Sequence, residues 1–516
     1  MTMRKIILTF FGLALFTIIS SCVDDLDTEP KVELTLQQLL EQDPNAIEGV
    51  LSRLYGSFAL SGPSGPGSSD ISDDAGESPF LRGIINLQDF TADGMKNRWG
   101  DDGLDQLTTT SQWTSNNKFF RYLYNRAYYT IPQCNNLLNV LPNAGVDIPE
   151  QIKSEVRFLR ALAYFYVIDA FGKGVLATDE NFGTSEFLPE ASRLELFNYV
   201  ESELLAIEST IGNNNGYGRA NTFVVDMLLS KLYINAEVYS GTARYNDAVT
   251  YLNKVITEGG FSLENNFLQN FSGDNYISSE IIYPLIADPI VSQSYGNTTY
   301  IVNGSLSPDT IPILDFGAAE GWQGHRATSA WYGLFGDLDT SNDQRASLFW
   351  TQGHNYTMTD YREWTDGYPS IKFRNKDLNE IPTSGTSFSG TDFPLYRLSD
   401  TYLMYAECAL RGASNANMND ALTYVNMVRT RSNADAISMS GLNLDFIIDE
   451  RGRELNLEGH RRTDLIRFGK FAGSSYVWPW KGNIAAGTSI PETYKLFPIP
   501  QSALDANTNL TQNPGY

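Results

Sequence analysis

Asn246-Asp-Ala-Val-Thr-Tyr-Leu-Asn-Lys-Val255 is a ten-residue stretch that returns near the end of the chain as Asn419-Asp-Ala-Leu-Thr-Tyr-Val-Asn-Met-Val428. The two copies are identical at seven of ten positions. Each follows another helical run that contains Ala-Glu, at Ala236-Glu237 and at Ala406-Glu407. Small residues at the crossing of paired helices are typical of tetratricopeptide-type units. Because such a pair buries its apolar face only by stacking on a neighbour, the repeat predicts a helical array.

Further amphipathic runs extend this array in both directions. Within them, apolar residues recur near the three- and four-residue spacing of one helix face. We therefore predict a mostly α fold built on a tetratricopeptide-type helical-repeat scaffold. The predicted helices span residues 119–141, 152–171, 194–211, 222–239, 399–411 and 444–468.

Two segments interrupt the helical pattern, and they are rich in Gly, Asn and Asp. They hold six of the eight tryptophans and contain short β-like runs at 281–286 and 298–302. We expect them to form a loop-rich α+β cap subdomain, and functional groups often lie on such loops. The expected organisation is a signal peptide at 1–21, an N-terminal tether with the first helices at 22–60, cap segments at 61–115 and 262–394, and scaffold at 116–261 and 395–516.

The N-terminus has the pattern of a secretory signal. Arg4 and Lys5 precede an apolar run, which ends in Ile19-Ser-Ser-Cys22. A cysteine directly after small residues resembles a bacterial lipobox, in which the thiol takes a diacylglycerol and becomes the new N-terminus. We therefore expect Cys22 to be the lipid attachment site and the mature chain to be anchored to a membrane rather than embedded in it.

Charge and cysteine content exclude several classes of protein. Removing Arg4 and Lys5 leaves 35 basic against 61 acidic residues, a net charge of −26. This excess argues against nucleic acid or anionic lipid as a partner. The remaining cysteines, Cys134 and Cys408, form no disulfide framework or zinc motif. Since the three histidines are scattered as well, we expect no metal site and no cofactor.

Several longer motifs together resemble the SusD/RagB family of bacterial surface lipoproteins, and the likeness runs nearly from end to end. The strongest is Glu450-Arg-Gly-Arg-Glu-Leu-Asn-Leu-Glu-Gly-His-Arg-Arg-Thr-Asp-Leu-Ile-Arg-Phe-Gly469. The others are Glu155-Val-Arg-Phe-Leu-Arg-Ala-Leu-Ala-Tyr-Phe-Tyr166, Leu395-Tyr-Arg-Leu-Ser-Asp-Thr-Tyr-Leu-Met-Tyr-Ala-Glu407, Leu496-Phe-Pro-Ile-Pro-Gln501 and Asn513-Pro-Gly-Tyr516.

The resemblance implies a tetratricopeptide scaffold with a cap and a role outside the cell. Family members bind glycans, or in some cases peptides, and form the lid of a SusC-type TonB-dependent outer-membrane transporter. The acidic stretch Val23-Asp-Asp-Leu-Asp27 also resembles the export signal that carries lipoproteins of Bacteroidetes to the cell surface. The expected location is therefore the outer membrane, with the lipid-anchored protein exposed at the surface.

Residues of the cap resemble the glycan site of a starch-binding family member. The likeness lies in four segments: Gly76-Glu-Ser-Pro-Phe-Leu-Arg82, Trp99-Gly-Asp-Asp102, Ser294-Tyr-Gly-Asn-Thr-Thr-Tyr300 and Gly321-Trp322. In the relative the position of Asp102 is an asparagine, and a metal-associated loop is more acidic than residues 271–276 here. An aromatic arc against sugar faces, with polar groups on the hydroxyl edges, suits a helical α-glucan. The implied glycan-binding residues are Asp74, Arg82, Trp99, Asp102, Tyr295 and Trp322.

Residues 450–467 mix carboxylates, arginines and His460, a composition that could suggest acid–base catalysis. However, charges three and four residues apart pair on one helix face, and arginine forks also bind carboxylates of neighbouring helices. We interpret the run as a structural ion-pair network and expect no enzyme. Three functions stay open: capture of α-glucan, capture of another glycan such as laminarin or a related β-glucan, and hydrolysis by a carboxylate pair.

Overall fold

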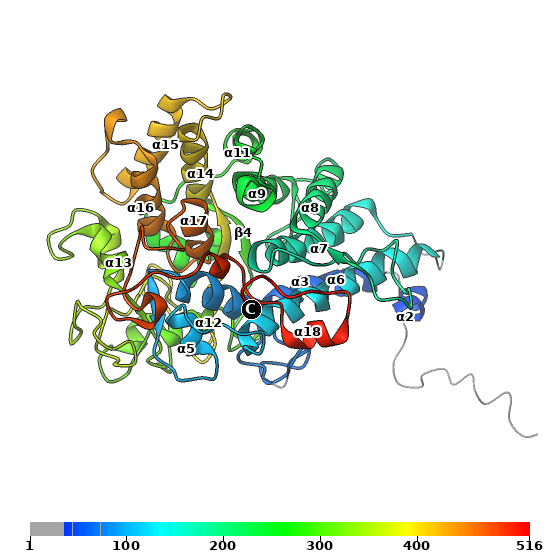
Figure 1. Cartoon of the computed structure of the whole chain (residues 1–516), viewed down its shortest axis with the longest axis horizontal. Helices are drawn as coiled ribbons and strands as arrows, with labels where there is room; N and C mark the ends of the chain where they lie inside the picture. Colours follow the sequence, from blue (N-terminus) through cyan, green and yellow to red (C-terminus); the bar gives the residue numbers. More distant parts are fainter. Residues whose placement is uncertain (1–35, 44, 73, 144, 146) are drawn as a thin grey trace, which may run out of the picture.

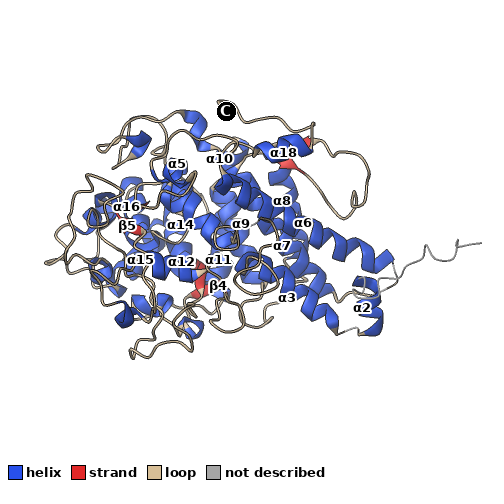
Figure 2. Cartoon of the chain, turned by 90° about the horizontal axis from the view of Figure 1, so that it is seen from below, coloured by secondary structure: helices blue, strands red, loops and turns tan. Residues whose placement is uncertain are grey.

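The computed structural model describes residues 36–43, 45–72, 74–143, 145 and 147–516. The predicted signal peptide at 1–21 and Cys22 lie outside the described residues. In these residues helices dominate the fold and strands occur only as short pairs, as Figure 2 shows. The predicted mostly α class is therefore confirmed. Within the described ranges, no helix is both long enough and apolar enough to cross a lipid bilayer.

The scaffold is a series in which successive helices pack one on the next (Figure 1). The two copies of the repeat lie on α11 and α15, which pack against α9 and α14 respectively. Because α11 also packs on α14, the two halves of the scaffold meet directly. The series comprises α6 (Lys118–Asn143), α7 (Glu150–Ala170), α8 (Arg193–Ile207), α9 (Thr222–Ile234), α10 (Ala236–Ser240), α11 (Tyr245–Glu258), α14 (Leu398–Leu410) and α15 (Met418–Arg431).

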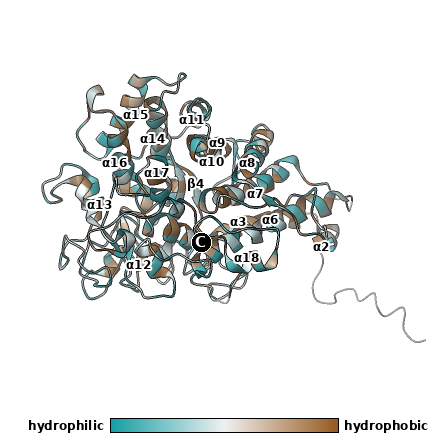
Figure 3. Cartoon of the chain, in the orientation of Figure 1, coloured by the Kyte–Doolittle hydropathy of each residue, from teal (hydrophilic) through white to brown (hydrophobic). Residues whose placement is uncertain are grey.

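Helix α8 illustrates how local sequence sets these elements. Ser192 and Glu195 form a reciprocal capping box, which satisfies backbone N–H groups at the helix start. Leu196, Val200 and Leu204 follow at four-residue spacing and are fully buried. Figure 3 shows hydrophobic and hydrophilic stretches alternating along most helices, as expected for helices that bury one face.

The predicted helix at 444–468 is wrong in one respect, because two helices replace it. They are α16 (Leu444–Leu455) and α17 (Arg461–Arg467). Between them the backbone turns, and Leu457 has a φ of +67°. The buried carboxylate of Asp89 accepts the freed N–H groups of Leu457 and Gly459 at 3.1 and 3.0 Å. A distant side chain therefore stabilises a break that local periodicity does not reveal.

The cap joins residues from both loop-rich segments. Strand β1 (Met95–Asn97) pairs antiparallel with β5 (His325–Ala327), placing Asn97 opposite His325. The predicted strand at 281–286 is confirmed as β4 (Ile281–Leu285), which pairs with β6 (Phe393–Arg397). The strand expected at 298–302 is wrong: this run forms α12 (Thr298–Gly304), which begins where the Asn297 side chain accepts a hydrogen bond from Thr299 N–H.

Shorter elements complete the described part of the chain, and a continuous hydrophobic core includes residues of both scaffold and cap. The remaining helices are α2 (Leu36–Gln42), α3 (Ala46–Ala59), α4 (Phe80–Ile84), α5 (Leu104–Thr108), α13 (Ser329–Tyr332) and α18 (Gln501–Ala506), with a π-helical turn η1 (Ile85–Phe90). Strands β2 (Gly174–Val175) and β3 (Glu190–Ala191) pair with each other. The 3₁₀ turns are η2 (Phe267–Phe271), η3 (Asn275–Ile277), η4 (Ile313–Phe316), η5 (Gly333–Phe335), η6 (Gln344–Leu348), η7 (Met439–Gly441), η8 (Lys481–Asn483) and η9 (Glu492–Lys495).

Candidate functional site

The charged run at 450–467 forms a buried ion-pair network. Most of its pairs reach other elements rather than the same helix. Arg345 binds Glu450 and Glu454 at 2.8 and 2.7 Å, and Arg397 binds Glu454 and Glu458 at 2.6 and 2.7 Å. The interpretation as structural ion pairs agrees with these contacts, and binding of neighbouring elements contributes more pairs than helical spacing does.

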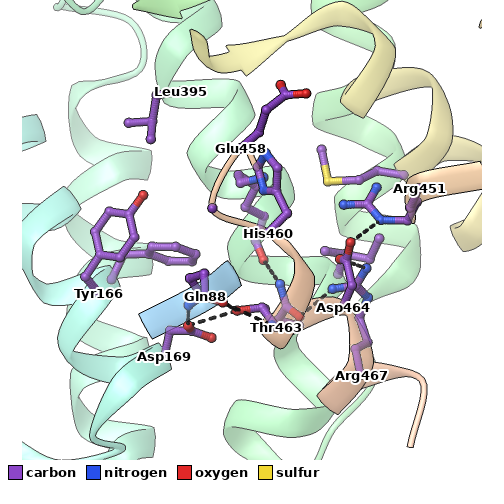
Figure 4. Close-up of a pocket in the computed structure, with 16 residues that line it drawn as sticks. Gln88, Tyr166, Asp169, Leu395, Arg451, Glu458, His460, Thr463, Asp464 and Arg467 are labelled. Carbon is purple, nitrogen blue, oxygen red and sulfur yellow. Dashed lines mark hydrogen bonds and ion pairs between the residues drawn. The ribbon is translucent and has the colours of Figure 1, made fainter. Parts of the chain in front are cut away.

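A small cavity borders this network, and Figure 4 shows Arg451 directed at Asp464 beside His460. The cavity has about 30 Å³ of space, close to one water molecule's share of liquid volume. Burial, reinforced by the positive charge of Lys231, lowers the pKa of His460 to about 3. The ring is therefore neutral near pH 7, and neither the space nor the histidine suits acid–base chemistry on a sugar.

Three predicted aromatic residues lie in series on the cap. The ring centroid of Trp322 is 6.4 Å from that of Trp99 and 6.5 Å from that of Tyr295. Both indoles are half-buried, whereas the Tyr295 side chain is 42% exposed. Residues from both cap segments thus form one aromatic strip, which we call the arc: Trp99, Trp322 and Tyr295.

Backbone contacts hold the arc in place. The Trp99 indole N–H donates to the carbonyl of Trp322 at 3.0 Å, and the Trp322 N–H donates to Asn303 O at 2.7 Å. Gly324 lies against Trp99 so closely that a Cβ there would stand 2.6 Å from the indole ring. His325 packs 5.5 Å behind Trp99, and burial with the charge of Arg82 holds its pKa well below its usual range. A neutral ring therefore supports the arc from behind.

Arg82 is the centre of the polar groups beside the arc. Its guanidinium lies 4.5 Å from the Tyr300 ring centroid and 5.8 Å from that of Trp99. It donates to the carbonyl of Gly76 at 3.1 Å, and its ion-pair partners are Glu77 and Asp101 at 3.5 and 3.6 Å. The side chain of Arg82 is buried and already has ion-pair partners. It is therefore better placed to position neighbouring groups than to donate freely to a ligand.

The two predicted aspartates differ in their surroundings. Asp74 Oδ1 accepts the N–H of Glu77 at 2.9 Å. A Cβ on Gly76 would lie 3.5 Å from Asp74 and 3.8 Å from Tyr295, so Asp74 stands close to the end of the arc. Asp102 is exposed. Among the described residues it has no hydrogen bond or ion pair, whereas its neighbour Asp101 is the one that faces Arg82.

Sequence reasoning missed three further residues at this site. Phe388 lies 5.0 Å from Tyr295 and extends the aromatic strip. Glu320 accepts the indole N–H of Trp322 at 3.1 Å. The third is Asp101, because this residue, rather than the predicted Asp102, faces Arg82. Phe388 stands in a loop without periodicity, so no local pattern distinguishes it. The gathered groups suit binding of a ligand with apolar faces and hydroxyl edges.

The described part of the chain contains no group of three or more His, Cys, Asp or Glu side chains placed to hold a metal ion. Cys134 and Cys408 are both free and buried.

Comparisons with known proteins identify the family. A model of the SusD family matches residues 325–516. The starch-binding protein SusD of Bacteroides thetaiotaomicron is 31% identical over 99% of this chain and 99% of that protein. SusD-like protein P25 of Formosa agariphila is 25% identical over 81% of each.

Solved structures show the same fold. Surface glycan-binding protein A from Bacteroides thetaiotaomicron, in complex with laminarihexaose, has a TM-score of 0.69 and 21% identity, covering 91% of this chain and 99% of that one. A SusD superfamily protein from Parabacteroides distasonis has a TM-score of 0.71 and 20% identity, covering 94% and 100%. The expectation of a non-catalytic binding protein agrees with the starch-binding relative that is 31% identical. The chain belongs to the SusD family.

Proposed function

We propose that the protein captures α-glucan, as starch or maltooligosaccharides, at the cell surface. The observation that carries this proposal is the arc, in which Trp99, Trp322 and Tyr295 lie in series with centroids 6.4 and 6.5 Å apart. A helical α-glucan presents a curved run of apolar ring faces, which such a strip can contact. The starch-binding relative, 31% identical over nearly the whole chain, supports this ligand.

Polar groups at the edge of the arc would bind sugar hydroxyls. We assign this role to Asp74 and Asp102, and we infer that Arg82 holds Asp101 in place while it orients Trp99. Charge-assisted hydrogen bonds are roughly twice as strong as neutral ones, so carboxylates give specificity on a wet surface. In this proposal the cap, at 61–115 and 262–394, carries the ligand, and the helical scaffold holds the cap.

Delivery and location complete the proposal. We infer that Cys22 carries the lipid anchor, that the protein is exposed on the outer membrane, and that it passes its ligand to a SusC-type TonB-dependent transporter. Fractionation of cells that produce the Cys22→Ser chain tests the anchor. The variant is expected in the soluble fraction and the unaltered protein with the membranes; membrane association of both would contradict the anchor.

A β-glucan is the second candidate ligand, favoured by the solved relative that holds laminarihexaose. Calorimetric titration of the lipid-free chain from residue 24 separates the two. Heat from maltoheptaose and none from laminarihexaose is expected. Heat from laminarihexaose alone would replace α-glucan by β-glucan, and heat from neither would refute both ligands.

A further inference from the structure

A hollow of about 420 Å³ opens on the cap, and Tyr217 of the scaffold also lines it. Two exposed tyrosines line it. Tyr276, in η3, is 62% exposed, and Tyr217, in the loop between α8 and α9, is 47% exposed. The Tyr217 hydroxyl donates to buried Asp392 at 2.6 Å, which fixes its ring. Exposed aromatic faces around a concavity are typical of a binding surface.

Carboxylates of fixed orientation line the same hollow. Asp288 Oδ1 accepts the N–H of Val291 at 2.6 Å, and Asp377 Oδ1 accepts that of Ile381 at 2.8 Å. Asp274 Oδ1 accepts the Gln269 amide at 3.0 Å. In Asp274 and Asp288 one carboxylate oxygen sets the side chain and the other is available to a hydroxyl donor, whereas Asp377 Oδ2 already accepts the Asn379 amide at 3.5 Å. Such acceptors lose little conformational entropy when they bind a ligand.

Two loops connect this hollow to the arc. Residues 286–289 line the hollow, and the same loop continues to Tyr295. Residues 381–384 line it too, and their loop continues to Phe388, whose ring is 5.0 Å from Tyr295. The loops also pack on each other, since a Cβ on Gly385 would lie 2.7 Å from Pro289. The hollow and the arc are therefore neighbouring features of one cap.

We propose that this hollow is a second carbohydrate-binding site, with Tyr276 and Tyr217 contacting pyranose faces and Asp274 and Asp288 accepting hydroxyl hydrogen bonds. The ligand class is a neutral polysaccharide, because the hollow carries several carboxylates. A cation is disfavoured, since the described residues hold no group of three carboxylates close enough to bind one. The inference rests on the proposed function: a long glucan held at the arc would meet this site at high effective concentration.

The test compares ligands of two lengths. Tyr276→Ala is expected to weaken affinity for a long α-glucan such as glycogen by about 10-fold, because the second contact is lost, and to leave affinity for maltoheptaose unchanged. Ile277→Ala is the matched control, since this neighbour in η3 is 60% exposed and does not line the hollow. Calorimetry measures the oligosaccharide, and affinity electrophoresis in glycogen gels measures the polymer.

Two double variants measure glycogen binding by the hollow when the arc is disrupted. Trp322→Ala should keep weak retardation by glycogen, and this should disappear in Trp322→Ala/Tyr276→Ala but not in Trp322→Ala/Ile277→Ala. Equal glycogen binding by the unaltered protein and Tyr276→Ala, with loss in Trp322→Ala, overturns the second site and leaves the proposed function. Two further outcomes also overturn the second site. In one, Tyr276→Ala loses as much affinity for maltoheptaose as for glycogen. In the other, titration with calcium ions gives heat in the unaltered protein and none in Tyr276→Ala. Absence of glucan binding by the unaltered protein refutes both proposals.

Discussion

The indole N–H of Trp99 donates a 3.0 Å hydrogen bond to the backbone carbonyl of Trp322, 223 positions further along the chain. This bond satisfies the single polar atom of the Trp99 side chain within the protein. It therefore joins the two cap segments at the arc, and the indole, which packs on His325, offers a ligand apolar ring surface rather than its polar edge.

Removing the central ring should abolish most binding. Trp322 contacts both Trp99 and Tyr295, so Trp322→Ala breaks the strip in the middle. We expect maltoheptaose affinity to fall about 10-fold or more, on the order of 1.4 kcal/mol, with the thermal unfolding midpoint nearly unchanged. Tyr356→Ala is the control, because Tyr356 is an exposed cap aromatic outside the arc. Unaltered affinity in Trp322→Ala would exclude the arc as the binding site.

Gly324→Ala should displace Trp99 without touching a ligand group. The added Cβ would stand 2.6 Å from the indole, which forces the ring to move. Maltoheptaose affinity should therefore fall. Gly49→Ala is a matched control, since the exposed α3 position has nothing within 4 Å, and there we expect about 0.5–1 kcal/mol of added stability and no change in affinity. Equal affinities in both variants would mean that Trp99 orientation does not matter.

The buried ion pairs should matter for stability. Arg397 pairs with Glu280, Glu454 and Glu458, all buried. Arg397→Ala therefore removes one cation shared by three buried carboxylates, and the remaining partners Arg345, Arg431 and Lys372 compensate them only in part. Breaking such a network costs about 3–5 kcal/mol, measured by denaturant unfolding. Lys495→Ala removes the exposed pair with Glu492 and should cost less than about 1 kcal/mol. Similar losses in the two variants would contradict a structural role for the network.

Asp226 gives a prediction about pH. Its carboxylate is buried in α9, and neither oxygen has a hydrogen-bond partner among the described residues. Burial, with the negative charge of Glu208, raises its pKa to about 7. Because the folded state holds this proton more tightly than the unfolded state, stability from Asp226 is present below about pH 4 and is lost as the pH rises through 7.

Asp226→Asn removes that penalty. The variant should gain stability relative to the unaltered protein as the pH rises from about 4 to 8, measured by urea unfolding across this range. Asp435→Asn, which removes a carboxylate from an exposed position, is measured beside it as the control. If the stability difference between Asp226→Asn and the unaltered protein stays constant with pH, then folding does not raise the pKa of Asp226, and the prediction is contradicted.

The helices of the scaffold could be predicted because their periodicity is local. Residues 152–171 correspond to α7, and 399–411 to α14. The break in the helix after Leu455 could not be predicted, because Asp89, hundreds of residues away in the sequence, stabilises it. The run at 298–302 has β-branched residues, but the cap supplied by Asn297 starts a helix there instead.

The candidate site was predictable only in part. Family resemblance named Trp99, Tyr295 and Trp322, and the structure places them in series, but no spacing rule predicts that segments so far apart meet. Asp101 and Asp102 are neighbours of the same type, so only the direction of each side chain distinguishes the one that faces Arg82. Phe388 comes from an irregular loop and carries no sequence pattern that marks it.

A co-crystal structure of the chain from residue 24 with maltoheptaose would show where the glucan binds. We expect electron density for glucose units along the faces of Trp99, Trp322 and Tyr295, with hydroxyls in hydrogen-bond distance of Asp74 or Asp102. Ligand density at another surface, with these three rings in contact with solvent only, would contradict this expectation.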